Sequence, residues 1–136
     1  MIYYDTDVLV NYCVEQEVNK HKQAIQLVEQ AIANGLFFSS ILSLNELAFA
    51  LTKVREKVSR DEITKHLNDF YLLDPVPVTL AHIQRAAKIA HKIGFSHMSD
   101  CVHTAVAEEF CDGLYTYNRS DFSLIQHHTK LKITIL

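Results

Sequence analysis

The first two acids of the chain follow directly after a short apolar segment that favours a β-strand. Residues 2–4 form this segment, Asp5 comes next, and Asp7 lies at the start of a helical pattern. In an open α/β sheet, ligands bind at the carboxyl ends of the strands. Asp5 is therefore a candidate for a functional site, whereas Asp7 is interpreted first as a cap of the helix that follows.

Three later segments each carry one acid that could join Asp5. Glu46 lies in a helical pattern after a second strand, Asp100 opens a later helix, and Asp121 follows a further strand. Each acid also has a structural interpretation. Glu46 fits an S-x-x-E capping box that begins at Ser43. Asp100 would stabilise the dipole of its helix, and Asp121 would be an ordinary loop acid.

Carboxylates that converge from separate segments predict a metal site. Like charges in close proximity repel and raise the pKa of at least one of them. A bound divalent cation would remove this repulsion, and oxygen ligands favour Mg²⁺ or Mn²⁺ over zinc. Such an ion polarises a phosphoryl oxygen and makes a bound water nucleophilic. The four acids therefore indicate metal-assisted hydrolysis of a phosphodiester.

The pattern of the remaining chain predicts the fold that would bring these acids together. Short apolar strands alternate with helices, which indicates an α/β fold with a mostly parallel sheet of four or five strands and helices on both faces. Right-handed crossovers then place the carboxyl ends of the strands at one edge. The expected strands are residues 2–4, 36–39, 76–78, 114–116 and 133–136. The expected helices are residues 7–13, 18–34, 43–54, 59–73, 79–93 and 100–111, with one more between the last two strands.

Composition is consistent with one folded domain over residues 1–136. Hydrophobic residues make up 49% and charged residues 21% of the chain, so a packed core is expected. The net charge of −3 is unlike that of a basic nucleic-acid-binding domain, although clustered acids would lower the charge of a nuclease. Three cysteines without a C-x-x-C pair favour a reduced, cytoplasmic protein. No apolar run approaches the ~18 residues that span a membrane.

Four segments together resemble the motifs of the PIN-domain family, and within it the VapC type of ribonuclease toxins. These segments are YDTDVL at 4–9, SLNEL at 43–47, SDCVHTAVA at 99–107 and TYNRSDF at 116–122. Each motif is weak alone, but four in this order extend over almost the whole chain. The resemblance implies a PIN-like three-layer sandwich whose strands, numbered along the chain, have the order 3-2-1-4-5.

The resemblance also implies the site and its partners. Asp5, Glu46 and Asp100 would be metal ligands and catalytic acids, with Asp121 as the fourth acid. The ion would be Mg²⁺ or Mn²⁺ and the substrate RNA, often tRNA. The family further implies a homodimer and a small antitoxin partner.

Five neighbouring residues are expected to support these acids or to contact the substrate. Thr6 and Thr116 could orient carboxylates or water, and Arg119 could contact a phosphate. Asp7 stands where the family more often has Asn or Ser. Asn118 replaces an Asp found in other members, which leaves open whether position 118 or 121 contacts the metal.

The sequence therefore predicts a metal-dependent endoribonuclease that acts as the toxin of a toxin–antitoxin pair. Two alternatives stay open. Asp5 could be the nucleophile of a phosphatase that resembles the haloacid-dehalogenase family, although no later lysine is a convincing partner. The chain could also be a PIN-like module that binds RNA or protein without cleavage. The eight histidines show no metal-binding spacing and are interpreted as structural or exposed.

Overall fold

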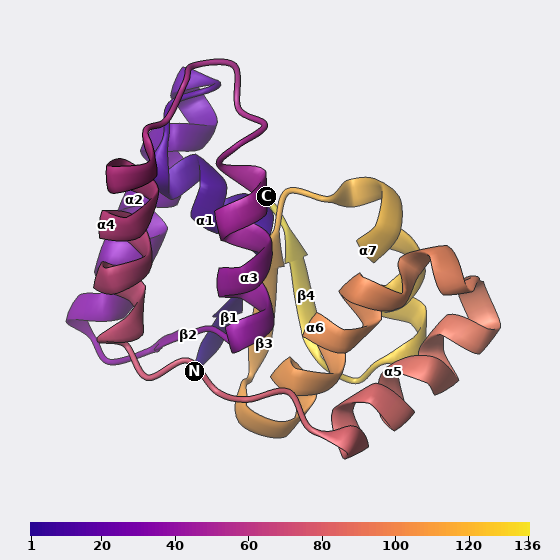
Figure 1. Ribbon diagram of the computed structural model, residues 1–136. Coiled ribbons are helices and arrows are strands. Elements are labelled where there is room, and N and C mark those ends of the chain that lie inside the picture. The colour runs from indigo at the N-terminus through magenta and orange to yellow at the C-terminus, as the bar shows by residue number, and fades with distance from the viewer.

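The computed structural model describes residues 1–136 and has a parallel sheet between two layers of helices (Figure 1). The sheet order is β2-β1-β3-β4, and every neighbouring pair is parallel. The strands are β1 (Ile2–Tyr4), β2 (Phe37–Phe38), β3 (Gly113–Thr116) and β4 (Lys132–Ile135). The predicted α/β class, with a parallel sheet and helices on both faces, is confirmed.

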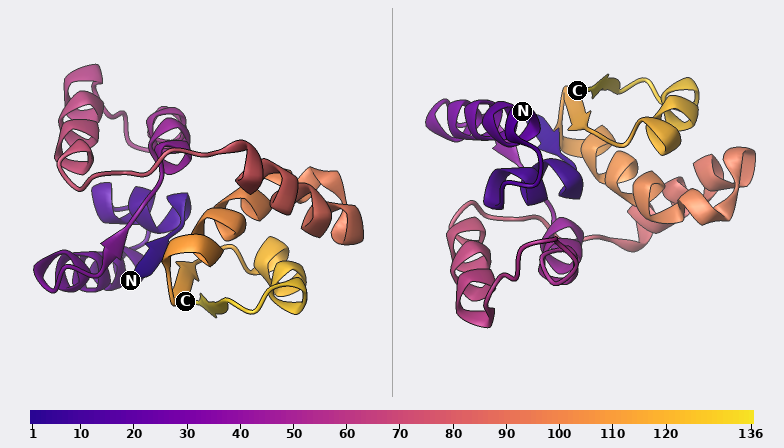
Figure 2. Two further views of the ribbon diagram at one scale, coloured as in Figure 1. Left: turned by 90° about the horizontal axis from the view of Figure 1, so that it is seen from below. Right: turned by 90° about the horizontal axis from the view of Figure 1, so that it is seen from above.

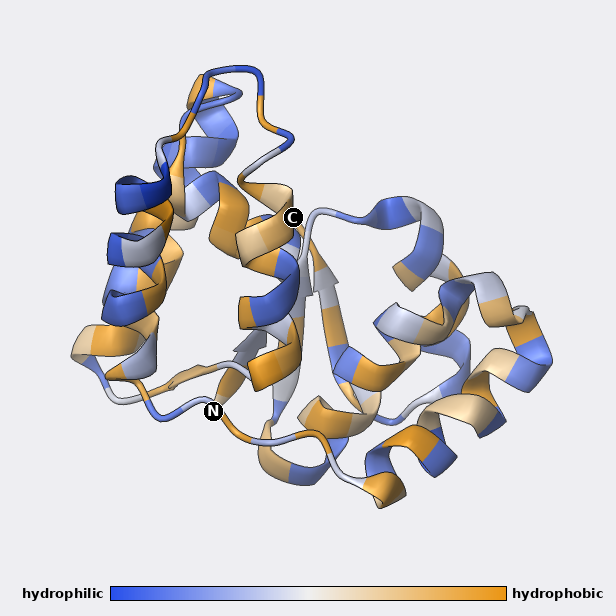
Figure 3. Cartoon of the chain, in the orientation of Figure 1, coloured by the Kyte–Doolittle hydropathy of each residue, from blue (hydrophilic) through white to orange (hydrophobic).

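Seven helices cover the two faces of the sheet (Figure 2). They are α1 (Thr6–Cys13), α2 (Val18–Ala33), α3 (Ile41–Ala50), α4 (Arg60–Tyr71), α5 (Leu80–Ile93), α6 (Met98–Phe110) and α7 (Arg119–Ile125), with short 3-10 turns η1 (Phe95–His97) and η2 (Gln126–His128). Apolar and polar residues alternate along the helices, as expected of helices that are buried on one side (Figure 3). None of the helices combines the length and the hydropathy needed to cross a bilayer.

The core consists of two clusters, one on each face of the sheet. Successive residues of a strand point to opposite faces. Tyr3 accordingly packs with residues of α5, α6 and α7, whereas Tyr4 packs with residues of α1 to α4. Both tyrosines are almost fully buried. The backbone of β1, and with it the position of Asp5, is thus fixed from both sides.

The expected strand at 76–78 is reduced to one bridge, between Val76 and Ser40. The ladder cannot extend toward the N-terminus, because Asp74 has a left-handed backbone with a φ of 51°. It cannot extend the other way, because α3 begins at Ile41, where the partner segment turns into a helix. The sheet therefore has four strands, and the bridge takes the outer place that the predicted order gave to a strand.

The helix that carries Glu46 begins earlier than predicted. Ser40, not Ser43, is the N-cap of α3, and its side-chain oxygen accepts a hydrogen bond from Ser43 N at 3.3 Å. The proposed capping box is therefore wrong, and Glu46 lies in the second turn. The helix also ends at Ala50, short of the expected Val54. Since Glu46 is not needed to cap its own helix, its carboxylate is free to contact other elements.

The other predicted helix ends lie within two residues of the observed ones, but one predicted cap is wrong. Ser59 caps α4, and Gly94 ends α5. Gly35 follows α2 with a left-handed φ of 64°, which glycine adopts at little cost. Ser99 does not cap α6, because η1 runs directly into this helix and the helix already begins at Met98. The Ser99 hydroxyl is therefore available for a contact elsewhere.

Candidate active site

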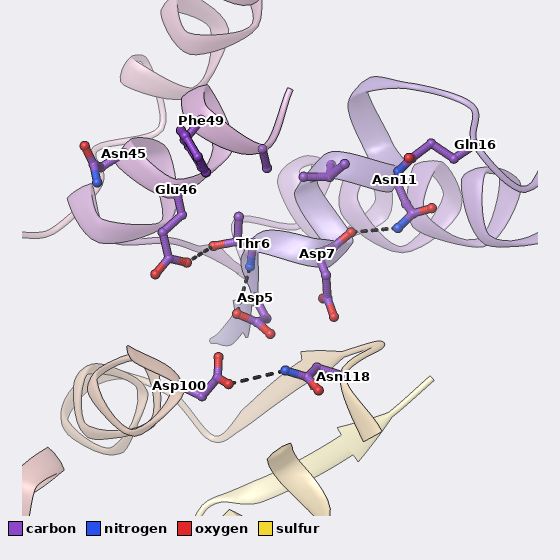
Figure 4. A pocket seen from close by; sticks show the side chains of 12 residues that line it. Asp5, Thr6, Asp7, Asn11, Gln16, Asn45, Glu46, Phe49, Asp100 and Asn118 are labelled. Atoms are coloured by element: carbon purple, nitrogen blue, oxygen red, sulfur yellow. Dashed lines mark hydrogen bonds between the residues drawn. The ribbon is translucent and has the colours of Figure 1, made fainter. Parts of the chain in front are cut away.

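A cavity of about 500 Å³ opens at the carboxyl end of β1 (Figure 4). The segments that form it are the end of β1, helices α1, α3 and α6, and the residue before α7. The lining residues are Asp5, Thr6, Asp7, Val10, Asn11, Gln16, Asn45, Glu46, Phe49, Ala50, Asp100 and Asn118. The structure thus brings three of the four predicted acids to one cavity, at the edge where the sequence analysis expected them.

Asp5 combines a structural and a site position. It is the N-cap of α1, and its Oδ1 accepts a hydrogen bond from Thr6 N at 2.8 Å. Its Oδ2 accepts one from Thr116 Oγ1, also at 2.8 Å. Burial raises the pKa of Asp5. The expectation that Thr116 orients a carboxylate agrees with this contact.

Asp7 lies in the cavity and does not cap α1, because Asp5 already does so. Its Oδ2 accepts hydrogen bonds from Tyr117 N at 3.0 Å and from Thr116 Oγ1 at 3.2 Å. Burial and the nearby charge of Asp5 raise the pKa of Asp7 to about 7. The interpretation as a helix cap is therefore wrong, and Asp7 is a further carboxylate of the site.

Asn118, rather than Asp121, forms the wall opposite β1. Its Nδ2 donates to Asp121 Oδ2 at 2.6 Å and to Asp100 Oδ2 at 3.3 Å, so it links the two acids. Burial, followed by the charge of Asp5, raises the pKa of Asp100 to about 8. Asp121 lies behind Asn118, where it is hydrogen-bonded to His97. Burial alone would raise the pKa of Asp121, but hydrogen bonds led by that of Asn118 lower it.

Glu46 is held by donors from three different segments. Thr6 Oγ1 and His103 Nε2 each donate to its Oε2 at 2.7 Å. The Ser99 hydroxyl donates to its Oε1. Burial acts to raise the pKa of Glu46, but hydrogen bonds led by that of His103 outweigh it and lower the pKa to about 2. Glu46 is therefore a fixed, ionised carboxylate at the side of the cavity.

Comparison with known proteins identifies the family. The PIN domain family matches residues 2–126. This chain belongs to the PIN domain family. No curated protein matches the chain by sequence. Among solved structures, a chain of VapBC2 from Rickettsia felis, bound to a DNA fragment from their promoter, has a TM-score of 0.64 at 16% identity over 100% of this chain and 99% of that one. At this identity the match shows a shared fold.

The PIN domain contains a buried network that the sequence did not reveal. Tyr3 OH contacts His103 Nδ1 and Ser40 Oγ, both at 2.7 Å, and His103 in turn contacts Glu46. His103 is fully buried, which agrees with its interpretation as a structural histidine. The only indication in the sequence that His103 lies near the site was its position three residues after Asp100, on the same face of the helix. No pattern indicated that its partner is Glu46.

The wall of this PIN-domain cavity has no lysine or arginine. Arg119 was expected to contact a phosphate, but it is the exposed first residue of α7 and does not line the cavity. Thr6, the other predicted supporting hydroxyl, does line the cavity and contacts Glu46. The electrostatic character of the site is therefore set by its carboxylates.

The donor set of the PIN domain fits a hard divalent cation. The cavity wall offers carboxylate oxygens from Asp5, Asp7 and Asp100, and an amide from Asn118, with no cysteine or histidine. The raised pKa values of Asp7 and Asp100 reflect burial and mutual repulsion, which a cation would relieve. No three of the His, Cys, Asp or Glu side chains are already converged on one point. The chemistry of the donors therefore suits Mg²⁺ or Mn²⁺.

Proposed function

We propose that this PIN domain is a Mg²⁺- or Mn²⁺-dependent endoribonuclease and the toxin of a type II toxin–antitoxin pair. The observation that carries the proposal is the convergence of Asp5, Asp7, Glu46 and Asp100 on one cavity at the carboxyl edge of the sheet. Membership of the PIN family and the fold shared with a chain of the VapBC2 complex support it. The absence of lysine from the cavity wall argues against a phosphatase of the haloacid-dehalogenase type.

The carboxylates would have different roles in the reaction. Asp5, Asp7 and Asp100 would hold the cation, while Asn118 and Asp121 keep Asp100 in place. A bound divalent ion supplies charge neutralisation at the phosphoryl oxygens and lowers the pKa of a water. Glu46 is ionised and fixed, so it would contribute negative charge and accept a hydrogen bond from that water. Attack by water on phosphorus would break the bond to the leaving oxygen in line with it, and the proton that the water loses would end on the leaving oxygen.

The proposal includes partners and a location. We expect the protein to act on RNA in the cytoplasm, with tRNA among the candidate substrates, and to form a homodimer that a small antitoxin inhibits. Several large apolar side chains on the outer helices are exposed, among them Leu72 at 82% and Leu80 at 72%. Ile41 and Ile83 are also exposed and line one apolar groove, and contiguous apolar surfaces are typical of sites that contact other proteins.

RNA cleavage by the purified protein tests the proposal. We expect cleavage of single-stranded RNA or tRNA with Mg²⁺ or Mn²⁺ and none with EDTA. Asp5→Asn and Asp100→Asn should lose cleavage, because each removes a charge that holds the cation. Asp61→Asn is a matched control, since Asp61 is exposed in the first turn of α4.

Two results would contradict the proposal. Full metal-dependent cleavage by Asp5→Asn or Asp100→Asn would show that the site is elsewhere. Failure of the wild-type protein to bind Mn²⁺ in calorimetry would favour a PIN module that binds without cleavage. An aspartyl-phosphate trapped on Asp5 would instead support the phosphatase alternative.

A further inference from the structure

The active-site cavity has a second side that carries no charge. Asp7 on α1 and Glu46 on α3 belong to the carboxylates of the site. The other side chains that α1, α3 and the segment after α1 contribute to the cavity, apart from Thr6, are amide, aromatic and aliphatic (Figure 4). These residues are Val10, Asn11, Gln16, Asn45, Phe49 and Ala50. A cavity of about 500 Å³ is larger than an ion with its waters requires, since a water occupies about 30 Å³. The neutral side therefore has room for part of a substrate.

Phe49 presents its ring to this neutral side. It lies three residues after Glu46, so these two side chains share one face of α3, whereas Asn45 points away from Phe49 on the other side of Glu46 (Figure 4). Phe49 is 67% exposed although it lines the cavity. The Nζ of Lys53 lies 5.3 Å from the centre of its ring. Lys53 therefore lies over one face of the ring, and a nucleobase can stack on the other face or displace this flexible side chain.

Asn11 supplies a hydrogen-bond acceptor on the same side. It is only 8% exposed. Its Nδ2 donates to the backbone oxygen of Asp7 at 2.8 Å, which fixes the orientation of the amide (Figure 4). The Oδ1 atom accepts no hydrogen bond from the protein, and Asn11 lines the cavity. The Oδ1 atom reaches solvent, since Ser39 Oγ is the one fully buried side-chain polar atom without a partner, so it can accept a hydrogen bond from a ligand in place of water.

We propose that Phe49 and Asn11 form a nucleobase subsite, which holds one unpaired base beside the phosphodiester at the carboxylates. The proposal rests on the proposed ribonuclease function and adds the part of the RNA that the site recognises. Phe49 stacks on the base, and Asn11 Oδ1 accepts a hydrogen bond from an N–H group of the base. Lys53 contacts a phosphate at the rim.

The neutral character of this side explains why an unpaired base is its ligand. A phosphate would require cations, and the wall has none. A base has a flat π-face and hydrogen-bonding edges but no charge, which matches a phenyl ring flanked by amides. In a duplex both the faces and the edges of the bases are occupied. The subsite therefore favours single-stranded segments or loops.

Binding of a short RNA that contains 2-aminopurine tests the subsite without a readout of cleavage. The probe is an unstructured oligoribonucleotide with one 2-aminopurine, and each protein also carries Asp100→Asn to prevent cleavage. We expect the fluorescence of the probe to be quenched on binding. Phe49→Leu should abolish the quenching and weaken binding about 5- to 100-fold, as expected for one stacked base. Phe49→Trp should retain both the quenching and the affinity for the probe.

Two controls separate stacking from other effects. Phe95→Leu replaces another exposed aromatic ring, which does not line the cavity, and should change nothing. An oligonucleotide with an abasic position in place of the 2-aminopurine should bind more weakly and be insensitive to Phe49→Leu. This insensitivity would not follow from a general defect in folding.

Three outcomes would overturn the subsite. The first is unchanged affinity and quenching in Phe49→Leu. The second is an equal loss of binding with the abasic probe. The third is conversion of a dimer to a monomer by Phe49→Leu, measured by light scattering, with RNA binding unchanged, because Phe49 would then belong to a protein interface. If the wild-type protein cleaves no RNA with Mg²⁺ or Mn²⁺ but still binds the probe through Phe49, the ribonuclease assignment fails and the RNA-binding subsite stands.

Discussion

Glu46 illustrates how one carboxylate can be fixed by residues that do not face the substrate. Its donors are Thr6, Ser99 and His103, and His103 is itself held by Tyr3. Burial acts to lower the pKa of His103, but its contacts, led by Tyr3, raise that pKa well above the usual value. His103 is thus a positioning residue, which acts on the site through Glu46.

Replacement of His103 should lower metal binding or cleavage by more than the accompanying loss of stability explains. We expect His103→Phe to lower Mn²⁺ affinity or cleavage about 10- to 100-fold, as for other residues that orient metal-site carboxylates. His103→Gln, which keeps a donor for Glu46, should restore part of the loss. Calorimetric titration with Mn²⁺ and chemical denaturation would measure the two effects separately. Equal Mn²⁺ affinity together with equal cleavage in the wild type and His103→Phe would rule out the positioning role.

The start of α3 determines which of its side chains face the cavity. Because Ser40 caps the helix directly after β2, the face with Asn45, Glu46 and Phe49 turns toward the carboxyl end of β1. Ser40 also contacts Tyr3 OH and is fully buried. The cap therefore couples the sheet, the helix and the buried network.

Ser40→Ala should destabilise the protein more than Ser59→Ala. Ser59 is an exposed cap of α4, so its loss should cost about 1 kcal/mol. Loss of Ser40 removes a cap and also one of the three hydrogen bonds of the buried Tyr3 hydroxyl, which adds about 0.5–1.5 kcal/mol. Urea denaturation of the two variants measures the difference. A loss in Ser40→Ala no larger than that in Ser59→Ala would contradict the role assigned to the buried network.

The stability of the whole molecule should depend on pH and on divalent cations in a linked way. The pKa values of Asp7 and Asp100 are raised to about 7 and 8, so both acids stabilise the folded state when protonated. This contribution is complete below the unfolded pKa of about 4 and is lost as the pH rises through the folded values. The pKa values of Asp5 and His103 shift in the same direction. Glu46, with a pKa near 2, stays ionised throughout this range.

Without divalent cations, we therefore expect the melting temperature to fall between about pH 5 and pH 9. Mn²⁺ should raise it more at the upper end, because the cation replaces the lost protons. Thermal unfolding with EDTA or Mn²⁺ across this range measures both effects. Asp100→Asn should flatten the EDTA profile. A melting temperature that rises toward pH 9 in EDTA would show that the carboxylates do not repel one another as inferred.

The amino-acid sequence alone was sufficient to predict the layered α/β fold and the edge of the sheet at which the site lies. A buried apolar run that stops at Asp5 specifies a strand end, and parallel strands share one carboxyl edge. Patterns of this kind are local, so they can be read from neighbouring residues. The same locality explains the errors at Ser43 and Ser99, where a plausible cap, three residues before Glu46 or directly before Asp100, competes with another start of the helix.

Such patterns could not predict contacts between residues that are far apart in the sequence. Glu46 and His103 are 57 positions apart, and their hydrogen bond depends on how α3 and α6 pack across the end of β1. The position of Asp121 behind Asn118, and the approach of Phe49 and Asn11 on one wall, depend on the same packing. Periodicity tells which side of an element is buried, but not which side chains meet there. The sequence thus specified the carboxylates, and the packing of the helices specified what holds them and what lies beside them.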